Sequence, residues 1–285
     1  MAASIHPGEK LHYLFYSPIW DGRCAPFGLE ALPASHAVAV TGSRFIVSVD
    51  PHEEPLPISL AELPFQSLLS VEIGSALLLG WLSFRFVEND SVSKKTLLFR
   101  ATGARHFVAA VRMYRSLTAW PGREPSSRPP LSWADVRARA PHSFSAVEAL
   151  LLAEERPWTC AFSPPVWRTE GSKKTWVSTT PGSFFLVTTH GLFALVEEPG
   201  PHPDVLGYGL NLALFRFPEL HSVQLTDPTE GSAPSAVLRL YLGSEWSSAS
   251  LDFPVDERRI AEIRQFASMA TELASRERDH ALRRS

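Results

Sequence analysis

The residues best suited to chemistry in this sequence are three cations that lie close together, Arg168, Lys173 and Lys174. They occupy the segment RTEGSKKTW beside one acid, Glu170, so the segment carries a net charge of +2. Guanidinium and ammonium groups that converge in this way can bind a phosphate or the head group of an anionic lipid. At about 1 kcal/mol per basic residue near an anionic membrane, one such segment would anchor a protein only weakly. The three residues are therefore candidate anion ligands.

Histidine and cysteine, the usual metal ligands, show no metal-binding spacing. None of the ten histidines forms an H-E-x-x-H motif or an i, i+4 pair on a plausible helix. His202 and Asp204 flank Pro203 in a pattern that is more typical of a surface turn than of an ion site. The two cysteines, Cys24 and Cys160, are too few for a disulfide framework or a four-ligand zinc site, which indicates reduced thiols in a cytosolic protein.

Catalytic and nucleotide-binding motifs are also missing from the sequence. It contains no G-x-S-x-G, no G-x-x-x-x-G-K-[ST] and no G-x-G-x-x-G. Lys94 and Lys95 fit a solvated hairpin turn, and Trp81 shares no spacing with the other tryptophans. The sequence thus predicts no catalytic residue, no metal and no cofactor. An enzyme whose site has no readable motif is the most distant alternative.

The composition is that of a folded protein. Of 285 residues, 45% are apolar and 20% are charged, and such a length suits two domains. A net charge of −3 argues against a nucleic-acid-binding surface over the whole protein. The first twenty residues show no signal-peptide pattern, and the longest apolar run, 73–82, is too short to cross a bilayer. We expect a cytoplasmic protein.

The sequence repeats itself once, with matching blocks in the same order. The spacing between matching residues drifts only from 147 to 156. The matching blocks are FYSPIW (15–20) and FSPPVW (162–167), Val40-Thr41 and Val187-Thr188, ISLAELPFQSLLSVEI (58–73) and LNLALFRFPELHSVQL (210–225), WLSFRF (81–86) and VLRLYL (237–242), and TLLF (96–99) and SLDF (250–253). Because several blocks in one order are hard to obtain by chance, the sequence predicts a duplicated domain.

Each copy has the pattern of several strands followed by one helix. Short runs rich in Val, Ile, Phe and Ser alternate between two faces, as in 82–86. The apolar spacing changes to three and four from Phe107 and again from Ile260, which predicts one amphipathic helix per copy. Asp256 is placed to cap the second helix. The charged C-terminal residues, 276–285, are expected to fray as a solvated tail.

A proline-rich spacer, PGREPSSRPP (121–130), separates the copies. Two short helices are predicted after it, the first capped by Ser132 and the second by Ser143 or Ser145. Leucines 150–152 give the second helix more apolar surface than one buried stripe needs, so we expect it to fix the two domains in one orientation. The predicted division is domain 1 at 1–120, linker at 121–157, and domain 2 with a long C-terminal helix and charged tail at 158–285.

These features resemble the pleckstrin-homology (PH) superfold, in particular bacterial PH-like and GRAM-like domains. VTGSRFIVSVD and VTTHGLFALVEE are similar to a characteristic hairpin of those families, and LPFQSLLSVEIG and FRFPELHSVQL to the strand that follows it. That hairpin has Arg or Asp after its Thr, whereas this chain has Gly42-Ser43 and Thr189-His190. The resemblance covers everything but the linker and the tail. It implies a mainly β (α+β) fold of two PH-like domains, each of about seven antiparallel strands closed by an amphipathic helix.

The resemblance also implies a binding or scaffolding module, because PH-like domains rarely carry catalysis, but it does not name the ligand. The leading expectation is a non-enzymatic tandem module that binds a protein partner or assembles with itself and gains avidity from two surfaces. The alternative is a peripheral membrane adaptor. PH domains that hold phosphoinositides place cations around the loop between their first two strands, which here is the segment with Arg168, Lys173 and Lys174.

Overall fold

Two parts of the chain, each made of antiparallel strands that end in a helix, are joined by a helical linker. The computed structural model describes residues 5–17, 35–50, 58–119, 130–170, 175–198, 209–226, 236–243 and 248–282. The first half contains β1 (Leu11–Ser17), β2 (Ser35–Thr41), β3 (Arg44–Asp50), β4 (Ser59–Pro64), β5 (Leu68–Ala76), β6 (Leu79–Glu88), β7 (Ser91–Arg100) and α1 (Ala104–Thr118). The linker contains α2 (Trp133–Arg139) and α3 (Pro141–Glu148). The second half contains β8 (Pro157–Ser163), β9 (Val166–Glu170), β10 (Thr175–Thr180), β11 (Gly182–Thr188), β12 (Gly191–Glu198), β13 (Gly209–Phe215), β14 (Leu220–Thr226), β15 (Ala236–Gly243), β16 (Ser248–Val255) and α4 (Ile260–Leu282).

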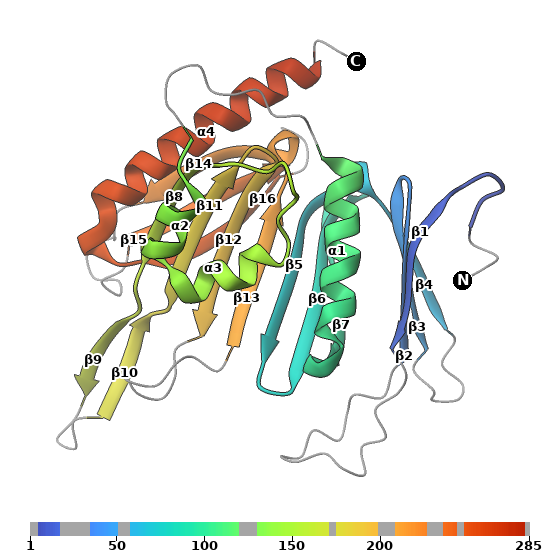
Figure 1. Cartoon of the computed structure of the whole chain (residues 1–285), viewed down its shortest axis with the longest axis horizontal. Helices are drawn as coiled ribbons and strands as arrows, with labels where there is room; N and C mark the ends of the chain where they lie inside the picture. The colour runs from blue at the N-terminus through green and yellow to red at the C-terminus, as the bar shows by residue number, and fades with distance from the viewer. Residues whose placement is uncertain are drawn as a thin grey trace.

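The strands form a mainly β structure in which one sheet belongs to both halves. A four-stranded sheet has the order β1-β2-β3-β4, and a three-stranded sheet has the order β14-β15-β16. Between them a seven-stranded sheet runs β7-β6-β5-β13-β12-β11-β8, and β9 and β10 form a separate two-stranded ribbon. The antiparallel pairing of β5 with β13 therefore joins the two halves edge to edge (Figure 1).

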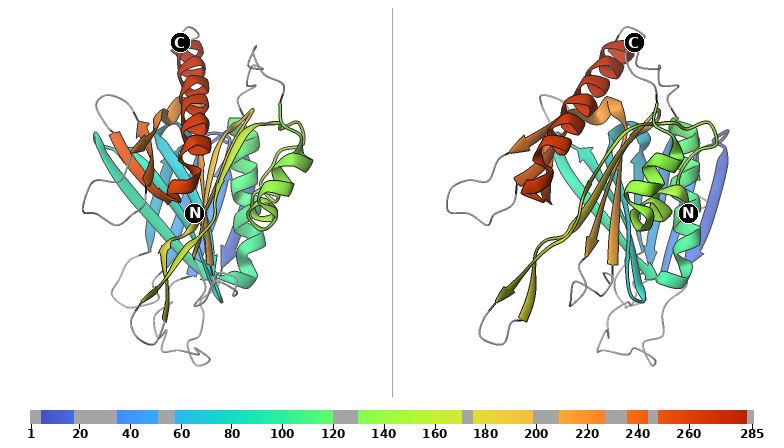
Figure 2. Two further views of the ribbon diagram at one scale, coloured as in Figure 1. Left: turned by 90° about the vertical axis from the view of Figure 1, so that its left-hand side faces the viewer. Right: turned by 60° about the vertical axis from the view of Figure 1, so that its left-hand side comes forward.

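The seven-stranded sheet separates two apolar cores. Helices α1, α2 and α3 lie on one side of it, and α4 with β14–β16 lies on the other (Figures 1 and 2). The first core runs from the interior of the first half through the linker to one face of β11–β13, and the second core lies on the opposite face of the same strands. Every residue of β11 is consequently buried. Both halves thus contribute strands to this sheet. The other elements of the first half pack on one side of it, and those of the second half, apart from the β9–β10 ribbon, pack on the other.

Strand register in the two halves follows the repeat read from the sequence. Across the β2–β3 and β11–β12 hairpins, residues spaced by 147 occupy equivalent positions. The equivalent opposed pairs are Val38–Val47 and Phe185–Ala194, and Val40–Phe45 and Val187–Leu192. The turns match too, since the hydroxyl oxygens of Thr41 and Thr188 each lie 3.2 Å from the carbonyl oxygen three residues ahead. A register shift recurs at equivalent points of the repeat, at Leu68/Ser70 and Leu220/Ser222.

The first sequence match is displaced by one residue. Phe15 lies opposite Val38, and Ala161 lies opposite Phe185, so Phe15 of β1 corresponds to Ala161 of β8 rather than to the Phe162 of the FYSPIW match. A shift of one residue reverses the face of a strand. Phe15 accordingly packs edge-to-face with Phe107 of α1, inside the first half, whereas Phe162 lies on the opposite, linker-facing side of its strand.

The last sequence match is displaced by two positions. Leu97 lies opposite Leu82, and Phe253 lies opposite Leu238, so Leu97 of β7 corresponds to Phe253 of β16 rather than to the Leu251 of the TLLF match. A shift of two positions keeps side chains on the same face. The alternation predicted for β6 and β15 is confirmed, because the inward residues of both strands are buried, namely Leu82, Phe84, Leu238 and Leu240.

Both long helices lie where the change of apolar period predicts them. Phe107 and Val111 of α1, and Ile263 and Phe266 of α4, are buried. Asp256 accepts a hydrogen bond from the backbone N–H of Arg258, although the element it caps is a short 3₁₀ turn ahead of α4.

The predicted fraying of the C-terminal residues is wrong for most of them, because α4 continues to Leu282. Arg278 holds this end against the three-stranded sheet, since its guanidinium donates to the carbonyls of Leu220 and His221 at 2.8 and 2.7 Å. Those carbonyls lie at the register shift of β14, where the ladder leaves acceptors open.

The linker helices are present, but the second is shorter than predicted. Ser132 and Asp135 form a reciprocal capping box at the start of α2, as expected for Ser132. Helix α3 begins at Pro141, which suits a first helical position, so Ser143 and Ser145 are not its caps. It ends at Glu148, and the leucines 150–152 follow it in a turn; Leu150 and Leu152 are buried there.

Candidate functional site

Only one of the three predicted anion ligands falls within the described part of the chain. Arg168 lies on β9, opposite Val177 of β10, in a ribbon that projects from the second half (Figures 1 and 2). The ribbon connects β8 to β11, as predicted for the connection between the first two strands. Lys173 and Lys174 lie outside the described residues, so the convergence of the three cations stays a prediction.

A row of three residues joins the two halves at the seam of the seven-stranded sheet. Trp81 of β6 and Asn211 of β13 both lie opposite Gly74 of β5, from either side. A Cβ atom on Gly74 would lie 2.2 Å from the Trp81 ring, so glycine is needed for the indole to lie across β5. The indole Nε1–H donates to Oδ1 of Asn211 at 3.1 Å. This bond orients the amide and leaves its Nδ2 group as a donor for another partner.

A cavity of about 350 Å³ lies beside this row, where β16 approaches the shared sheet. Both halves line it, because its walls come from β5, β6, β12, β13 and β16. Its apolar wall consists of Trp81, Val196, Ala213, Leu251, Phe253 and Pro254, and its polar wall of Glu72, Arg85, Asn211 and Asp252. Aromatic and aliphatic walls with a few converging polar groups are typical of small-ligand sites.

The charges around this cavity are paired, with one cation in excess. Buried Glu72 has Nζ of Lys94 at 3.2 Å and Nη2 of Arg85 at 3.5 Å. Asp252 accepts two hydrogen bonds from Arg239, at 2.7 and 2.8 Å, and these lower the pKa of Asp252. Together with Lys94 and Arg239, which do not line the cavity themselves, these ion pairs form a cluster of three cations and two carboxylates with a net charge of +1.

Two buried polar atoms in this region have no hydrogen-bond partner within the described ranges. They are Nε of Arg85 and Oγ of Ser70, and their residues lie opposite each other on β6 and β5. A buried donor without an acceptor costs about 1–3 kcal/mol, so most proteins satisfy such groups with protein, water or a ligand. Arg85 also lines the cavity with its side chain 20% exposed, so its guanidinium can meet a ligand there even though the Nε atom itself is buried.

Lys94 and Lys95 do not lie in a hairpin turn. The turn between β6 and β7 consists of Asn89 and Asp90, whose φ angles of 49° and 60° suit the left-handed conformation that a two-residue hairpin needs. Both lysines lie on β7, and Lys94 reaches across β6 to Glu72. The prediction of a turn at the two lysines was therefore wrong. The stronger turn signal in the sequence is the neighbouring Asn89-Asp90 pair.

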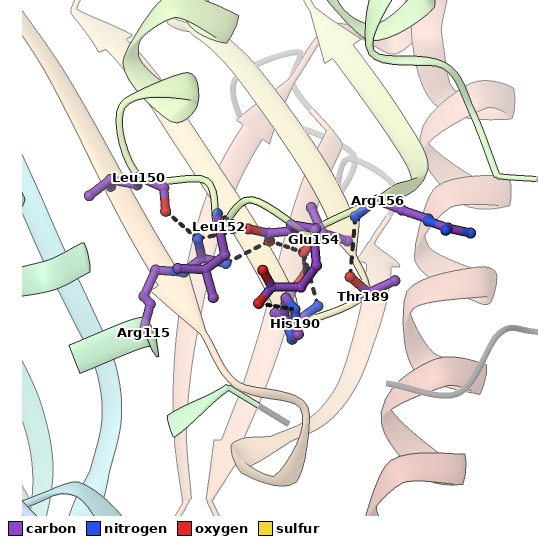
Figure 3. A network of polar contacts seen from close by, with 10 residues as sticks. Arg115, Leu150, Leu152, Glu154, Arg156, Thr189 and His190 are labelled. Atoms are coloured by element: carbon purple, nitrogen blue, oxygen red, sulfur yellow. Dashed lines mark hydrogen bonds and ion pairs between the residues drawn. The ribbon is translucent and has the colours of Figure 1, made fainter. Parts of the chain in front are cut away.

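A buried ion pair ties α1 to the linker and to the β11–β12 hairpin (Figure 3). Glu155, whose side chain is 0% exposed, accepts hydrogen bonds from Nη2 and Nη1 of Arg115, at 2.6 and 3.0 Å. The carboxylate also accepts from the backbone N–H of Leu152 at 2.9 Å and from the hydroxyl of Thr188. Arg115 donates in turn to the carbonyl of Leu150 (Figure 3).

The contacts beside this ion pair indicate a structural junction. The backbone N–H of Thr189 donates to the carbonyl of Arg156 at 2.9 Å, and the Arg156 N–H donates to the Thr189 hydroxyl at 3.2 Å (Figure 3). Oε1 of the exposed Glu154 lies 3.9 Å from Nε2 of His190. The adjoining cavity measures about 20 Å³, room for little more than one water molecule.

A second cluster of charges fixes the N-terminal residues to the first half. Arg44 donates to Glu9 from Nε at 3.0 Å and from Nη2 at 2.6 Å, and it also pairs with Glu62. The Arg44 hydrogen bonds, followed by one from Thr41, lower the pKa of Glu9 from 4.5 to about 2. A carboxylate whose pKa is depressed on folding stabilises the folded state when it is ionised.

This depression predicts acid sensitivity at Glu9. Because its folded pKa of about 2 lies below the ordinary value of 4.5, its contribution is complete above pH 4.5 and is lost as the pH falls towards 2. In Glu9→Gln, the free energy of unfolding should fall less steeply over this pH window than in the original protein. Urea unfolding at a series of pH values measures the difference, with the exposed Glu88→Gln as control; parallel curves for the original protein and Glu9→Gln would contradict the prediction.

Apolar side chains lie in solvent on the outer face of the β1–β4 sheet. Opposed residues share a face, and two rows cross this one. The rows are Tyr16–Ala37–Ser48–Leu60 and Leu14–Ala39–Ile46–Glu62. Ala39 and Ile46 are buried in the middle of the face, whereas Leu14, Tyr16 and Leu60 are 55%, 57% and 45% exposed. We call these three residues the open face.

In the second half the equivalent face is fully apolar and covered. Its rows are Phe162–Phe184–Leu195–Leu212 and Cys160–Leu186–Phe193–Leu214. They belong to the first core together with Val136 of α2 and with Phe144 and Val147 of α3. Burial also raises the pKa of the Cys160 thiol in this layer. In the second half, the linker helices therefore cover the rows that are equivalent to those carrying the open face in the first half.

Sequence reasoning did not single out the cavity residues or the open face. Trp81 had no matching tryptophan to mark it, and Arg85 and Asn211 are ordinary strand residues in the sequence. One signal could have been used: Gly74 interrupts the apolar run 73–82, and a glycine inside a strand often marks the close approach of another group.

Within the described ranges, no group of three or more His, Cys, Asp or Glu side chains is placed to hold a metal ion. The described helices include none that is long and apolar enough to span a membrane. No protein-family model matches this chain, and no curated protein matches it.

Proposed function

We propose that this chain is a non-enzymatic tandem PH-like module that binds a partner protein through the open face. The observation that carries the proposal is the contrast between equivalent rows: those of the second half are covered by helices, whereas Leu14, Tyr16 and Leu60 are about half exposed. Leu14 and Tyr16 lie two residues apart on β1 and Leu60 lies on β4 across the same face, and exposed apolar side chains gathered on one face of a folded protein are typical of an interaction surface.

Shared strand order and register support the tandem PH-like part of the proposal. In each half a four-stranded antiparallel meander is followed by a three-stranded meander and a helix, and the hairpin registers of the two halves agree strand by strand. This is the order of elements that the resemblance implies for a PH-like domain. Duplication of one ancestral unit accounts for both the sequence blocks and the registers; the cytoplasmic location stays a prediction.

The occupant we propose for the open face is an amphipathic helix of the partner. The second half supplies the internal precedent, because α2 and α3 lay Val136, Phe144 and Val147 on the equivalent rows. Glu62 lies in one of the rows of this face with its side chain 39% exposed, and it shares Arg44 with a second carboxylate, Glu9. The two carboxylates outnumber that arginine, so a helix with basic residues beside its apolar stripe fits best.

A photo-crosslinking amino acid in place of Tyr16 tests this proposal in cells of the source organism. We expect crosslinks to one protein, mapped by mass spectrometry to an amphipathic helical segment, and their loss in the Leu14→Ser/Leu60→Ser variant. The same crosslinker at Gln224, an exposed residue of β14, is the matched control. Because the substituted leucines are exposed, the variant should unfold at the same urea concentration as the original protein.

Three outcomes would contradict the partner-helix proposal. Crosslinks that persist in the double variant would place the contact elsewhere, and crosslinks only to a second copy, with a concentration-dependent mass in solution, would indicate self-assembly. Recovery by phosphatidylserine vesicles that is lost in Lys173→Glu/Lys174→Glu, without any crosslink at Tyr16, would favour the membrane adaptor instead.

A further inference from the structure

We propose that the cavity between the two halves binds a carboxylate carried on an apolar body, either a small aromatic or aliphatic acid or the C-terminus of a peptide that ends in an apolar residue. The site is separate from the open face and does not depend on the proposed function. It needs only the packing of β16 against the shared sheet and the β5–β13 seam.

Two hydrogen-bond donors from different halves are available to such a ligand. The guanidinium of Arg85 lines the cavity with the side chain 20% exposed, although its unpartnered Nε atom is itself buried. Nδ2 of Asn211 is left as a donor because the Trp81 indole occupies the amide oxygen at 3.1 Å. A carboxylate has two oxygens to accept from both groups, and its bond to a guanidinium is charge-assisted and therefore strong.

The charge of the ion-pair cluster around the cavity favours a monoanion. Glu72 is paired with Lys94 and Arg85, and Asp252 is paired with Arg239, which leaves a net charge of +1. One carboxylate balances this charge. A phosphate dianion would leave an excess negative charge beside two buried or half-buried carboxylates, and a cation would face Arg85. The wall therefore favours a carboxylate over either alternative.

The apolar wall and the volume set the size of the ligand body. Trp81, Leu251 and Phe253 supply aromatic and aliphatic surface beside the polar groups. The volume of about 350 Å³ lies at the lower end of the range for small-molecule sites, which extends from about 300 to 1,000 Å³. A single ring or branched chain with its carboxylate fits this space, and so does the last residue or two of a peptide.

Nuclear magnetic resonance of the full chain tests the proposal through the indole N–H of Trp81. The signal is assigned from its loss in Trp81→Phe. Phenylacetate is titrated against its uncharged analogue phenylacetamide, and a short peptide ending in phenylalanine is titrated against its C-terminal amide. We expect the acids to shift the Trp81 signal and the amides to leave it unchanged.

The variant Arg85→Lys keeps the positive charge but removes the planar guanidinium and its paired donors, and we expect it to weaken binding of the acid at least about tenfold. Arg112→Lys, at an exposed position of α1 on the opposite side of the shared sheet, is the matched control and should bind as the original protein does. Unchanged signals from the rest of the sheet show that Arg85→Lys is folded. The crosslinking experiment at Tyr16 reports on the partner separately.

Each outcome of the titrations either supports the proposal or overturns it. Binding of both acids supports a site for the shared chemistry, and binding of only phenylacetate or only the peptide assigns it to free acids or to chain termini. The proposal is overturned if neither acid shifts the signal at millimolar concentration, if the amides bind as well as the acids, or if Arg85→Lys has no effect.

Discussion

Replacement of Arg115 by leucine should lower the free energy of unfolding by about 3–5 kcal/mol, the usual cost of leaving a buried charge without its partner. The side chain of Glu155 is 0% exposed, and Arg115 is its cation, with two hydrogen bonds at 2.6 and 3.0 Å. The same arginine also holds the carbonyl of Leu150, so the linker loses two attachments to α1. Urea unfolding followed by circular dichroism measures the change.

An exposed ion pair provides the matched control for this prediction. Arg239 pairs with Asp252 by two hydrogen bonds, but both side chains are more than a third exposed. Arg239→Leu should therefore cost no more than about 1 kcal/mol. The double variant Arg115→Leu/Glu155→Leu should recover part of the loss, because it removes the unpaired charge. Equal, small losses for Arg115→Leu and Arg239→Leu would show that the junction does not hold the linker.

The second large effect is expected at Leu212, and its counterpart Leu60 is the control that the chain itself provides. The two leucines occupy equivalent positions in the two halves. Leu212 lies on β13 and Leu60 on β4, each at the end of a row that crosses four strands. Leu212 is 1% exposed beneath the linker layer, whereas Leu60 is 45% exposed. Leu212→Ala should lower the free energy of unfolding by about 2–5 kcal/mol, because it removes buried methyl groups and leaves a cavity.

Leu60→Ala should change the free energy of unfolding by only about 0.5 kcal/mol, as is usual for an exposed side chain. Both variants are measured by urea unfolding under the same conditions. A loss at Leu60 as large as that of a buried leucine, about 2 kcal/mol or more, would show that this part of the face is covered in the isolated protein. The proposal for the open face would then fail together with the prediction.

Much of the local structure could be predicted from the sequence because it depends on residues close together in the chain. Alternation in 82–86 and in 237–242 placed Leu82 and Leu238 in the two cores. The change of apolar spacing from Phe107 and from Ile260 indicated the two long helices, although α1 begins at Ala104, and Ser132 marked the beginning of α2. Period, capping and turn chemistry act over a few residues, so they can be read without the fold.

Several boundaries were wrong where a distant contact outweighed the local pattern. The C-terminal residues remain helical because Arg278 finds acceptors on β14, far earlier in the chain. Leu150 and Leu152 are buried although α3 ends before them, because the turn that follows the helix packs into the protein interior. The match of Phe15 to Phe162 failed because similar letters one position apart face opposite sides of a strand.

The sequence by itself determined that the chain is mainly β, that two runs of strands each end in a helix, and which residues of each strand are apolar. Only the tertiary structure decided that β5 pairs with β13 and that Glu72, Arg85 and Asn211 meet in one cavity. It also decided that the linker helices cover one outer face, whereas Leu14, Tyr16 and Leu60 of the other stay exposed. The physical reason is that strand edges pair through backbone N–H and C=O groups, which are the same for almost every residue. The choice of partner edge therefore depends on how the two cores pack, and this leaves no local mark in the sequence.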